Sequence, residues 1–363
     1  MDFPIQMEQI LKHLVSVKPN EYGATRNYKD GAVTRLSPYI SRGVISTRQV
    51  YEHIRSLNID WRKTEKLIQE LAWRDYWQQV WIEKQDLIFV DLKKAQEPIS
   101  NHKIPKAIVE ANTGIEAVDE SIQSLYETGY MHNHMRMYVA SICCNIAQCH
   151  WAEPSNWLYS HLLDGDLASN NLSWQWVAGT NSKKKYYANQ DNINKYFYSH
   201  QKNTFLDVTY DQFGTLPIPK ELLDLTSIDL KLSLPSTDSS MLNKDRTTLI
   251  YNYYNLDPNW SKEQDVQRIL LLEPSVFEKH PISEKCIDFT IRLSQNIKGI
   301  QLFVGEFEEL TQVISPDNIR YKEHPLNRHY QGKEESRDWL TTIKGYYPSF
   351  FAFWKKGKKE LKW

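Results

Sequence analysis

Apolar residues at helical spacing dominate the first half of the chain. In residues 61–84 they lie mostly three or four positions apart: Leu67, Leu71, Trp73, Trp77, Val80 and Trp81. This spacing places the side chains on one face of a helix. The segments 114–127, 130–149 and 155–163 show the same pattern, with Gly129 and Pro154 as breaks. Because strand-like alternation is scarce here, residues 1–205 are expected to form an all-α domain.

The second half has a different pattern. Residues 206–245 contain several prolines and a serine-rich run at 236–240, as is typical of a linker or long surface excursion. Short apolar runs then begin at Thr248, Arg268 and Gly299, and helical stretches are expected near 283–297, 305–313 and 334–344. Strands that alternate with helices favour a parallel sheet. The sequence thus predicts a mostly α protein with a small α/β domain at 246–363.

Composition excludes several classes of protein. The chain has 363 residues, a length that favours two domains, and a net charge of −1, so any nucleic-acid contact has to rest on local patches. Candidates are the lysines at 183–185 and the tail lysines at 355–362, although a solvated loop and a frayed terminus are the plainer reading. No apolar run approaches the roughly 18 residues of a membrane span.

The first residues have neither a basic nor an apolar signal region, so we expect a cytoplasmic protein. The four cysteines are too few and too clustered for a disulfide framework, and we expect them to be buried and reduced.

Two dense polar and aromatic clusters lie at residues 128–137 and 164–176. Seven of the twelve tryptophans fall between Trp73 and Trp176. Large aromatic residues mostly fill cores and interfaces, but here they alternate with amides, carboxylates and arginine. The combination suggests a buried site for a large, flat, charged ligand.

Helical spacing brings some of these polar residues together. Asn133, Arg136 and Met137 stand at i, i+3 and i+4 and so share a helix face. Glu70 and Arg74 are also four apart and flank Trp73. A surface ion pair is the common explanation for such a Glu and Arg. The intervening tryptophan in an otherwise apolar helix favours a site instead.

Two further segments could contact the same ligand. Residues 34–37 precede Pro38 at a helix start, and backbone N–H groups there can bind an anion, although capping sequences of this kind are common. Asp164 and Asp166 with Asn170 look superficially like a metal loop. They lack the further acidic ligands that calcium requires, so no metal is expected. These carboxylates are better suited to accept hydrogen bonds from ribose hydroxyls or ring N–H groups.

Taken together, these residues resemble the FAD-binding catalytic domain of the DNA photolyase/cryptochrome family, from about Tyr22 to Tyr196. The resemblance implies an all-helical domain that holds FAD in a U-shape. It implies that Asn170 faces flavin N5 and that Glu70 and Asn133 also border the cofactor. The remaining cofactor residues implied are Tyr22, Thr34, Arg35, Leu36, Ser37, Arg74, Arg136, Asp164 and Asp166.

The resemblance also implies a repair site. The positions that contact a flipped-out cyclobutane pyrimidine dimer are all present: Glu70, Trp73, Asn133, Met137 and Trp176. Both tryptophans would stack on the dimer, and Glu70 would hydrogen-bond its Watson–Crick edge. The (6-4) branch of the family has His in place of Asn133, so the chain is similar to the pyrimidine-dimer type.

Some features depart from the family pattern. Trp174 and Trp151 match the proximal and middle members of the tryptophan chain that photoreduces the flavin, but the distal member has no match. The usual N-terminal antenna domain is missing, and the C-terminal α/β segment resembles it faintly, in swapped order. Residues 182–193 also differ from the usual sequence.

The resemblance therefore implies light-driven, FAD-dependent repair of pyrimidine dimers by electron transfer from reduced flavin, with UV-damaged DNA as the partner of a monomeric enzyme. An alternative is a cryptochrome-like blue-light photoreceptor without repair activity. A light-independent flavoprotein or binding module is a third possibility. Whether an antenna chromophore binds is left open.

Overall fold

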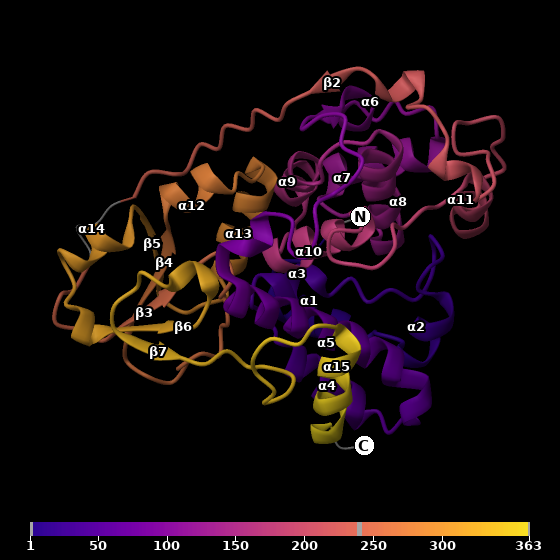
Figure 1. Ribbon diagram of the computed structural model, residues 1–363. Coiled ribbons are helices and arrows are strands. Elements are labelled where there is room, and N and C mark those ends of the chain that lie inside the picture. Colours follow the sequence, from indigo (N-terminus) through magenta and orange to yellow (C-terminus); the bar gives the residue numbers. More distant parts are fainter. Residues whose placement is uncertain (1–2, 238–241, 362–363) are drawn as a thin grey trace.

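The computed structural model describes residues 3–237 and 242–361. Part of the serine-rich run, together with Lys362 and Trp363 of the tail, lies outside these ranges. Figure 1 shows a helical half, a parallel sheet beside it, and a long connection that crosses from one to the other.

The first half is helical, as predicted. Its longest helix is α5, which has the bounds expected from the apolar spacing. The α-helices of this half are α1 (Met7–Val15), α2 (Pro19–Thr25), α3 (Ser37–Ser41), α4 (Thr47–Ser56), α5 (Trp61–Lys84), α6 (Lys106–Val109), α7 (Glu116–Thr128), α8 (Asn133–Ser141), α9 (Ala152–His161), α10 (Leu167–Ala178) and α11 (Gln190–Phe197). Two short antiparallel strands, β1 (Ile104–Pro105) and β2 (Leu225–Thr226), tie the connecting segment to the helical half.

Capping side chains set where the helices of the site begin. Asp60 accepts from Arg62 N at the start of α5, and Asp166 accepts from Ser169 N at the start of α10. Each cap satisfies a backbone N–H that the first turn leaves without an intrahelical partner. At the end of α7, Gly129 adopts φ +71°, which favours glycine.

The second half contains a five-stranded parallel sheet, which confirms the predicted strand arrangement. Its order is β5-β4-β3-β6-β7 and every neighbouring pair is parallel. The chain builds outward from β3 on one side and then returns to add β6 on the other, so the order reverses between β3 and β6. The elements are β3 (Thr248–Tyr251), β4 (Gln267–Leu272), α12 (Pro274–Lys279), α13 (Glu284–Ser294), β5 (Ile300–Val304), α14 (Phe307–Thr311), β6 (Ile319–Lys322) and β7 (Lys333–Glu335).

The prediction of a helix near 334–344 is wrong. Residues 333–335 form the edge strand β7, and the chain then runs extended to the helical half. There, Leu340 N donates to Asp75 at 2.7 Å and Arg48 donates to the Trp339 carbonyl. These long-range hydrogen bonds override the local helical pattern.

The C-terminal helix α15 (Phe350–Gly357) packs along α5 rather than on the sheet (Figure 1). The ring of Trp354 lies parallel to that of Trp61, and Lys358 forms an ion pair with Glu65 at 2.5 Å. One hydrophobic cluster includes buried residues of α1, α5, the sheet and α15. The domain limits 1–205, 206–245 and 246–363 remain a prediction, since the core is continuous between the two halves.

All four cysteines are buried and carry free thiols. Burial raises the pKa of the Cys286 thiol to about 11. Among the described residues, none of the helices combines the length and the apolarity that crossing a bilayer requires.

Candidate functional site

An ion pair between Arg136 of α8 and Asp164 anchors the site. The Arg136 Nη2 atom lies 2.9 and 3.0 Å from the two carboxylate oxygens, and the Asp164 side chain is only 4% exposed. Leu163 N donates to the Gly129 carbonyl, which fixes the loop before α10 against the loop before α8. Burial alone would raise the pKa of Asp164, but Arg136, Ser37 and Arg74 outweigh it and the pKa lies below its usual value. The carboxylate is therefore charged at neutral pH.

A second network joins α3, α5 and the start of α10. Arg74 donates to Ser41 Oγ at 2.6 Å, and Ser41 donates to the backbone carbonyl of Asp164 at 2.7 Å. Arg74 also lies 3.7 Å from the Asp166 carboxylate, which accepts from Gln78 at 2.7 Å. The structure thus brings together four predicted cofactor residues: Arg74, Arg136, Asp164 and Asp166.

Hydrogen-bond donors without a partner gather beside this network. Arg35 adopts φ +52°, and its Nε is buried with no partner among the described residues. The His132 Nδ1 accepts from His134 N, so Nε2 carries the proton of the neutral ring, and it too is buried and unpaired within the described ranges. Burial is the main cause that lowers the pKa of His132 to about 4, with smaller contributions from His134, Arg136 and Arg35.

These donors fit the diphosphate of FAD. The unpaired Arg35 Nε and His132 Nε2 groups are available for an acceptor-rich anion, and the charge of Arg136 lies close to His132. Ser37 opens α3, and Thr34 is fixed by His13, whose Nε2 lies 2.8 Å from the Thr34 carbonyl. Leu36, the fourth residue of the predicted segment, is 1% exposed.

Tyr22 and Glu70 lie at the junction of α2 and α5. Glu70 forms ion pairs with Arg26 at 3.5 Å and with Lys66 at 3.2 Å, and it remains 32% exposed. Burial and the Glu70 carboxylate raise the pKa of Tyr22, so the phenol stays neutral. The helix pair thus presents a carboxylate and a neutral phenol.

The residues implied for lesion contact stand on three packed helices. Trp73 lies on α5, Asn133 and Met137 on α8, and Trp176 on α10, which packs against both of the other helices. Trp176 is 38% exposed and lies beside the Tyr186 ring, with centroids 5.8 Å apart. Asn133 is also exposed.

The two tryptophans implied for electron transfer are buried. Trp174 is 2% and Trp151 is 1% exposed, and Trp151 Nε1 donates to Asp91 at 2.7 Å. Its ring neighbour is His150, with centroids 5.6 Å apart. Asn170 is held by its amide nitrogen, which donates to the Ser155 carbonyl.

Several residues of the site were not predicted from the sequence. Arg26 could have been found, because it stands four positions after Tyr22. Ser41 and Gln78 offered weaker signals, at helical spacing from Ser37 and Arg74. Arg337 donates to Gln78 Oε1 at 2.7 Å from the far end of the chain, and no local pattern reveals that contact.

Comparison with known proteins finds similarity to photolyases in the helical half of the chain. Residues 66–204 match the family described as the FAD binding domain of DNA photolyase. The deoxyribodipyrimidine photo-lyase of Buchnera aphidicola subsp. Acyrthosiphon pisum (strain APS) is 33% identical over 177 residues, which cover 46% of this chain and 37% of the relative. The enzyme of the same name from Escherichia coli (strain K12) is 29% identical over 189 residues, 49% of this chain and 40% of the relative.

A solved structure agrees with these matches. The cryptochrome of Synechocystis sp. PCC6803 shares 26% identity with a TM-score of 0.50, over 54% of this chain and 44% of that chain. The chain thus spans well under half the length of the curated relatives it matches. Tyr22 and residues 34–37 precede the matched family segment, and their roles remain predictions. Residues 66–204 thus match the FAD binding domain of DNA photolyase, and the helical half of the chain is similar to members of the DNA photolyase/cryptochrome family.

Proposed function

We propose that the protein is a light-driven, FAD-dependent lyase that splits cyclobutane pyrimidine dimers in DNA. The observation that carries this proposal is the placement of Trp73 and Trp176. These two flat side chains, both accessible in part, stand on α5 and α10, which pack against one another beside the Arg74–Asp166 network. The match to photolyases supports the same reaction class.

The residues that would bind FAD are divided by charge. Arg35, Arg136 and His132 would donate to its diphosphate, while Asp164 and Asp166 would accept from hydroxyl and ring N–H groups. Tyr22 and Asn170 would border the ring system. When bound, FAD supplies the blue-light-absorbing one-electron donor.

The remaining residues would receive the lesion. A damaged base pair costs less to extrude than an intact one, so a dimer can leave the duplex and enter a pocket. Trp73 and Trp176 would stack on its two rings, each contact stabilising the bound state by about 1–3 kcal/mol. Glu70 can still accept hydrogen bonds from the dimer's N–H groups, because its ion pairs with Arg26 and Lys66 are long. Asn133 and Met137 would border the lesion from α8.

The direct test is a repair assay on the FAD-loaded, reduced protein. A thymine-dimer oligonucleotide should be restored under blue light and remain unchanged in darkness. The variant Glu70→Gln should repair more slowly while it retains FAD, because a neutral amide offers the dimer a weaker acceptor than the carboxylate does. Loss of FAD in that variant would instead indicate that Glu70 acts by holding the cofactor.

A blue-light photoreceptor without repair activity is the second candidate. The similarity to the Synechocystis cryptochrome favours it, as does the environment of Trp151, whose ring neighbour is a histidine rather than a tryptophan. A light-dependent change in protease sensitivity, in protein that leaves dimers intact, would support this candidate over the lyase.

A further inference from the structure

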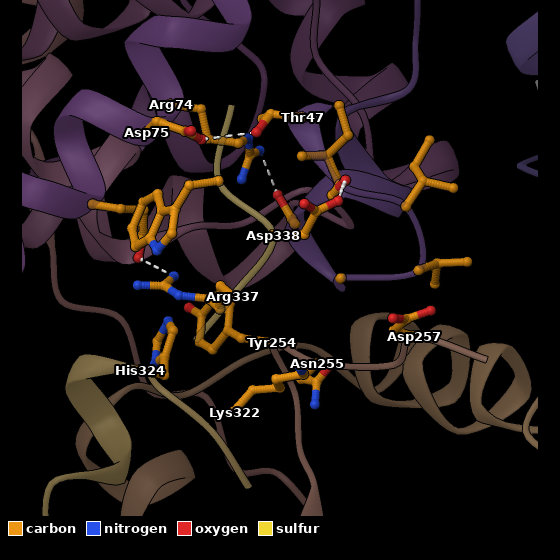
Figure 2. A pocket seen from close by; sticks show the side chains of 18 of the residues that line it. Thr47, Arg74, Asp75, Tyr254, Asn255, Asp257, Lys322, His324, Arg337 and Asp338 are labelled. Carbon is orange, nitrogen blue, oxygen red and sulfur yellow. Dashed lines mark hydrogen bonds between the residues drawn. The ribbon is translucent and has the colours of Figure 1, made fainter. Parts of the chain in front are cut away.

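A cavity of about 320 Å³ lies between the parallel sheet and the helical half. Tyr254 and Asn255, which follow β3, and His324, which follows β6, line one side of it, and Arg74 and Asp75 of α5 line the other (Figure 2). The order of the sheet reverses between β3 and β6. In open α/β sheets, ligands bind outside the carboxyl ends of the strands at such a reversal.

The close packing of the two halves makes this cavity a fixed feature. Leu256 N donates to the Arg42 carbonyl at 2.9 Å. Gly43 adopts φ +66°, and a Cβ atom there would lie 2.6 Å from the Tyr254 carbonyl oxygen. Only glycine permits this approach, and it seats the segment after β3 directly against the turn between α3 and α4.

Arg337 lines the cavity and has an unused hydrogen-bonding edge. Its Nη1 donates to Gln78 Oε1, while Nε and Nη2 are buried without a partner among the described residues. The N–H groups of Nε and Nη2 point the same way and form the edge that binds a carboxylate or phosphate through two hydrogen bonds. Figure 2 shows Arg337 beside His324 and Tyr254.

His324 adds a second unused donor. The side chain is 8% exposed and stacks on Tyr254, with centroids 4.5 Å apart. Its Nδ1 accepts from Leu326 N, so the proton of the neutral ring is on Nε2, which has no partner within the described part of the chain. Burial and the charge of Arg337 keep the pKa of His324 well below its usual value, and the ring is a neutral donor. The Asn255 amide nitrogen is a third unpaired donor.

The carboxylates of the cavity, in contrast, already accept hydrogen bonds. Asp75 accepts from Thr47 at 3.0 Å and from Leu340 N at 2.7 Å. Asp166 accepts from Gln78, Asp257 accepts from Asn259 N, and Asp338 accepts from Ser46. The groups that lack partners are therefore donors, and the missing component is an acceptor.

The geometry points to a binding site for a small anion, the phosphate or carboxylate group of a metabolite-sized ligand, held by the Nε and Nη2 edge of Arg337 and by His324 Nε2. The cavity volume falls in the lower range of small-molecule sites, so it has room for more than the anionic group alone. Tyr254 and Trp339 provide aromatic walls for the rest of such a ligand. This site does not depend on the proposed repair function.

Calorimetric titration of the FAD-loaded 363-residue chain tests the inference, with inorganic phosphate, AMP and citrate as separate probes. We expect saturable binding of at least one probe at one site per chain. Arg337→Gln should weaken that binding about tenfold or more, because a charge-assisted pair of hydrogen bonds is lost. Arg337→Lys should also weaken it, because an ammonium lacks the planar edge. The surface variant Arg292→Gln, on α13, is the matched control and should bind like the wild type.

The three probes identify the source of the anion. Phosphate that binds as tightly as AMP indicates a free-anion site, tighter AMP indicates a phosphate ester, and citrate alone indicates a carboxylate. Absence of saturable binding by all three probes would overturn the inference. Equal affinity in the wild type and Arg337→Lys would do the same, and this variant retains the charge should Arg337→Gln not fold. The FAD absorbance of each variant is the independent readout of an intact cofactor site.

Discussion

The indole of Trp73 lies face to face with the phenyl ring of Phe350, with centroids 3.9 Å apart and planes inclined by 10°. Phe350 is in turn parallel to Trp354 of the same helix, and Trp354 is parallel to Trp61. Helix α15 thus supports one face of a proposed lesion-binding tryptophan from the opposite end of the chain.

Replacement of Phe350 by Leu should loosen Trp73. The variant loses the aromatic pair, worth about 0.5–1.5 kcal/mol beyond the buried area, while most of the side-chain volume remains. We expect several-fold weaker binding of a dimer-containing oligonucleotide, with FAD content unchanged. Phe351→Leu is the control, because Phe351 is 67% exposed and should tolerate the change. Equal effects of the two substitutions on DNA binding would refute a positioning role for Phe350.

Asp164→Asn should destabilise the fold strongly. The substitution leaves the Arg136 guanidinium without its buried carboxylate, and removal of one partner of a buried pair costs about 3–5 kcal/mol. Urea unfolding measures the loss, and the FAD absorbance of the purified variant should fall with it. Asp288→Asn, in the exposed pair with Arg292, should change the free energy of unfolding by less than about 1 kcal/mol. Comparable losses in the two variants would contradict an anchoring role for the Arg136–Asp164 pair.

Asp75 should make the stability of the protein depend on pH. Burial raises its pKa to about 6, while Leu340 N and Thr47 lower it only in part. A carboxyl group whose folded pKa exceeds its unfolded value destabilises the fold when ionised. That cost is absent below the unfolded pKa near 4 and grows as the pH rises through about 6.

Comparison with Asp75→Asn isolates this effect. Relative to the wild type, the variant should gain stability between pH 4 and pH 8, by roughly 2–3 kcal/mol for a shift of about two pKa units. Any hydrogen bond lost with the carboxylate is lost at both pH values and cancels in the comparison. A difference in the free energy of unfolding that is constant with pH would mean that Asp75 titrates normally.

Substitutions at Trp174 and Trp176 should separate photoreduction of the flavin from binding of the lesion. They are two positions apart on α10, so one is buried and the other is 38% exposed. Under illumination with an external reductant, Trp174→Phe should slow the reduction of bound FAD several-fold, measured by flavin absorbance. Trp176→Phe should leave that rate unchanged and weaken binding of dimer DNA. The reverse pattern would exchange the two roles.

Helical spacing predicted much of the helical half because its signals are local. Helix α5 begins and ends where the apolar pattern of residues 61–84 does. The polar faces of α5 and α8 pointed to Arg74 and Arg136, and the structure joins them to Asp166 and Asp164. The identity of the cofactor was predicted from the resemblance to photolyases and not from helical spacing.

The rest depends on contacts between distant segments. The extended path of residues 336–340 follows from hydrogen bonds to Asp75 and Glu323, which a local pattern does not encode. Strands β6 and β7 have four and three residues, too short for a clear alternation. The support of Trp73 by Phe350 likewise joins opposite ends of the chain.

The most direct test of the proposed function is the light-dependent repair of a single thymine dimer. Reduced, FAD-loaded protein is mixed with a dimer-containing oligonucleotide, and the restored thymines are followed by their absorbance under blue light and in darkness. The proposed function predicts restoration in light alone, with repair slowed by Trp73→Ala and by Trp176→Ala. Full FAD loading and bound dimer DNA, with the dimer intact after illumination, would contradict it.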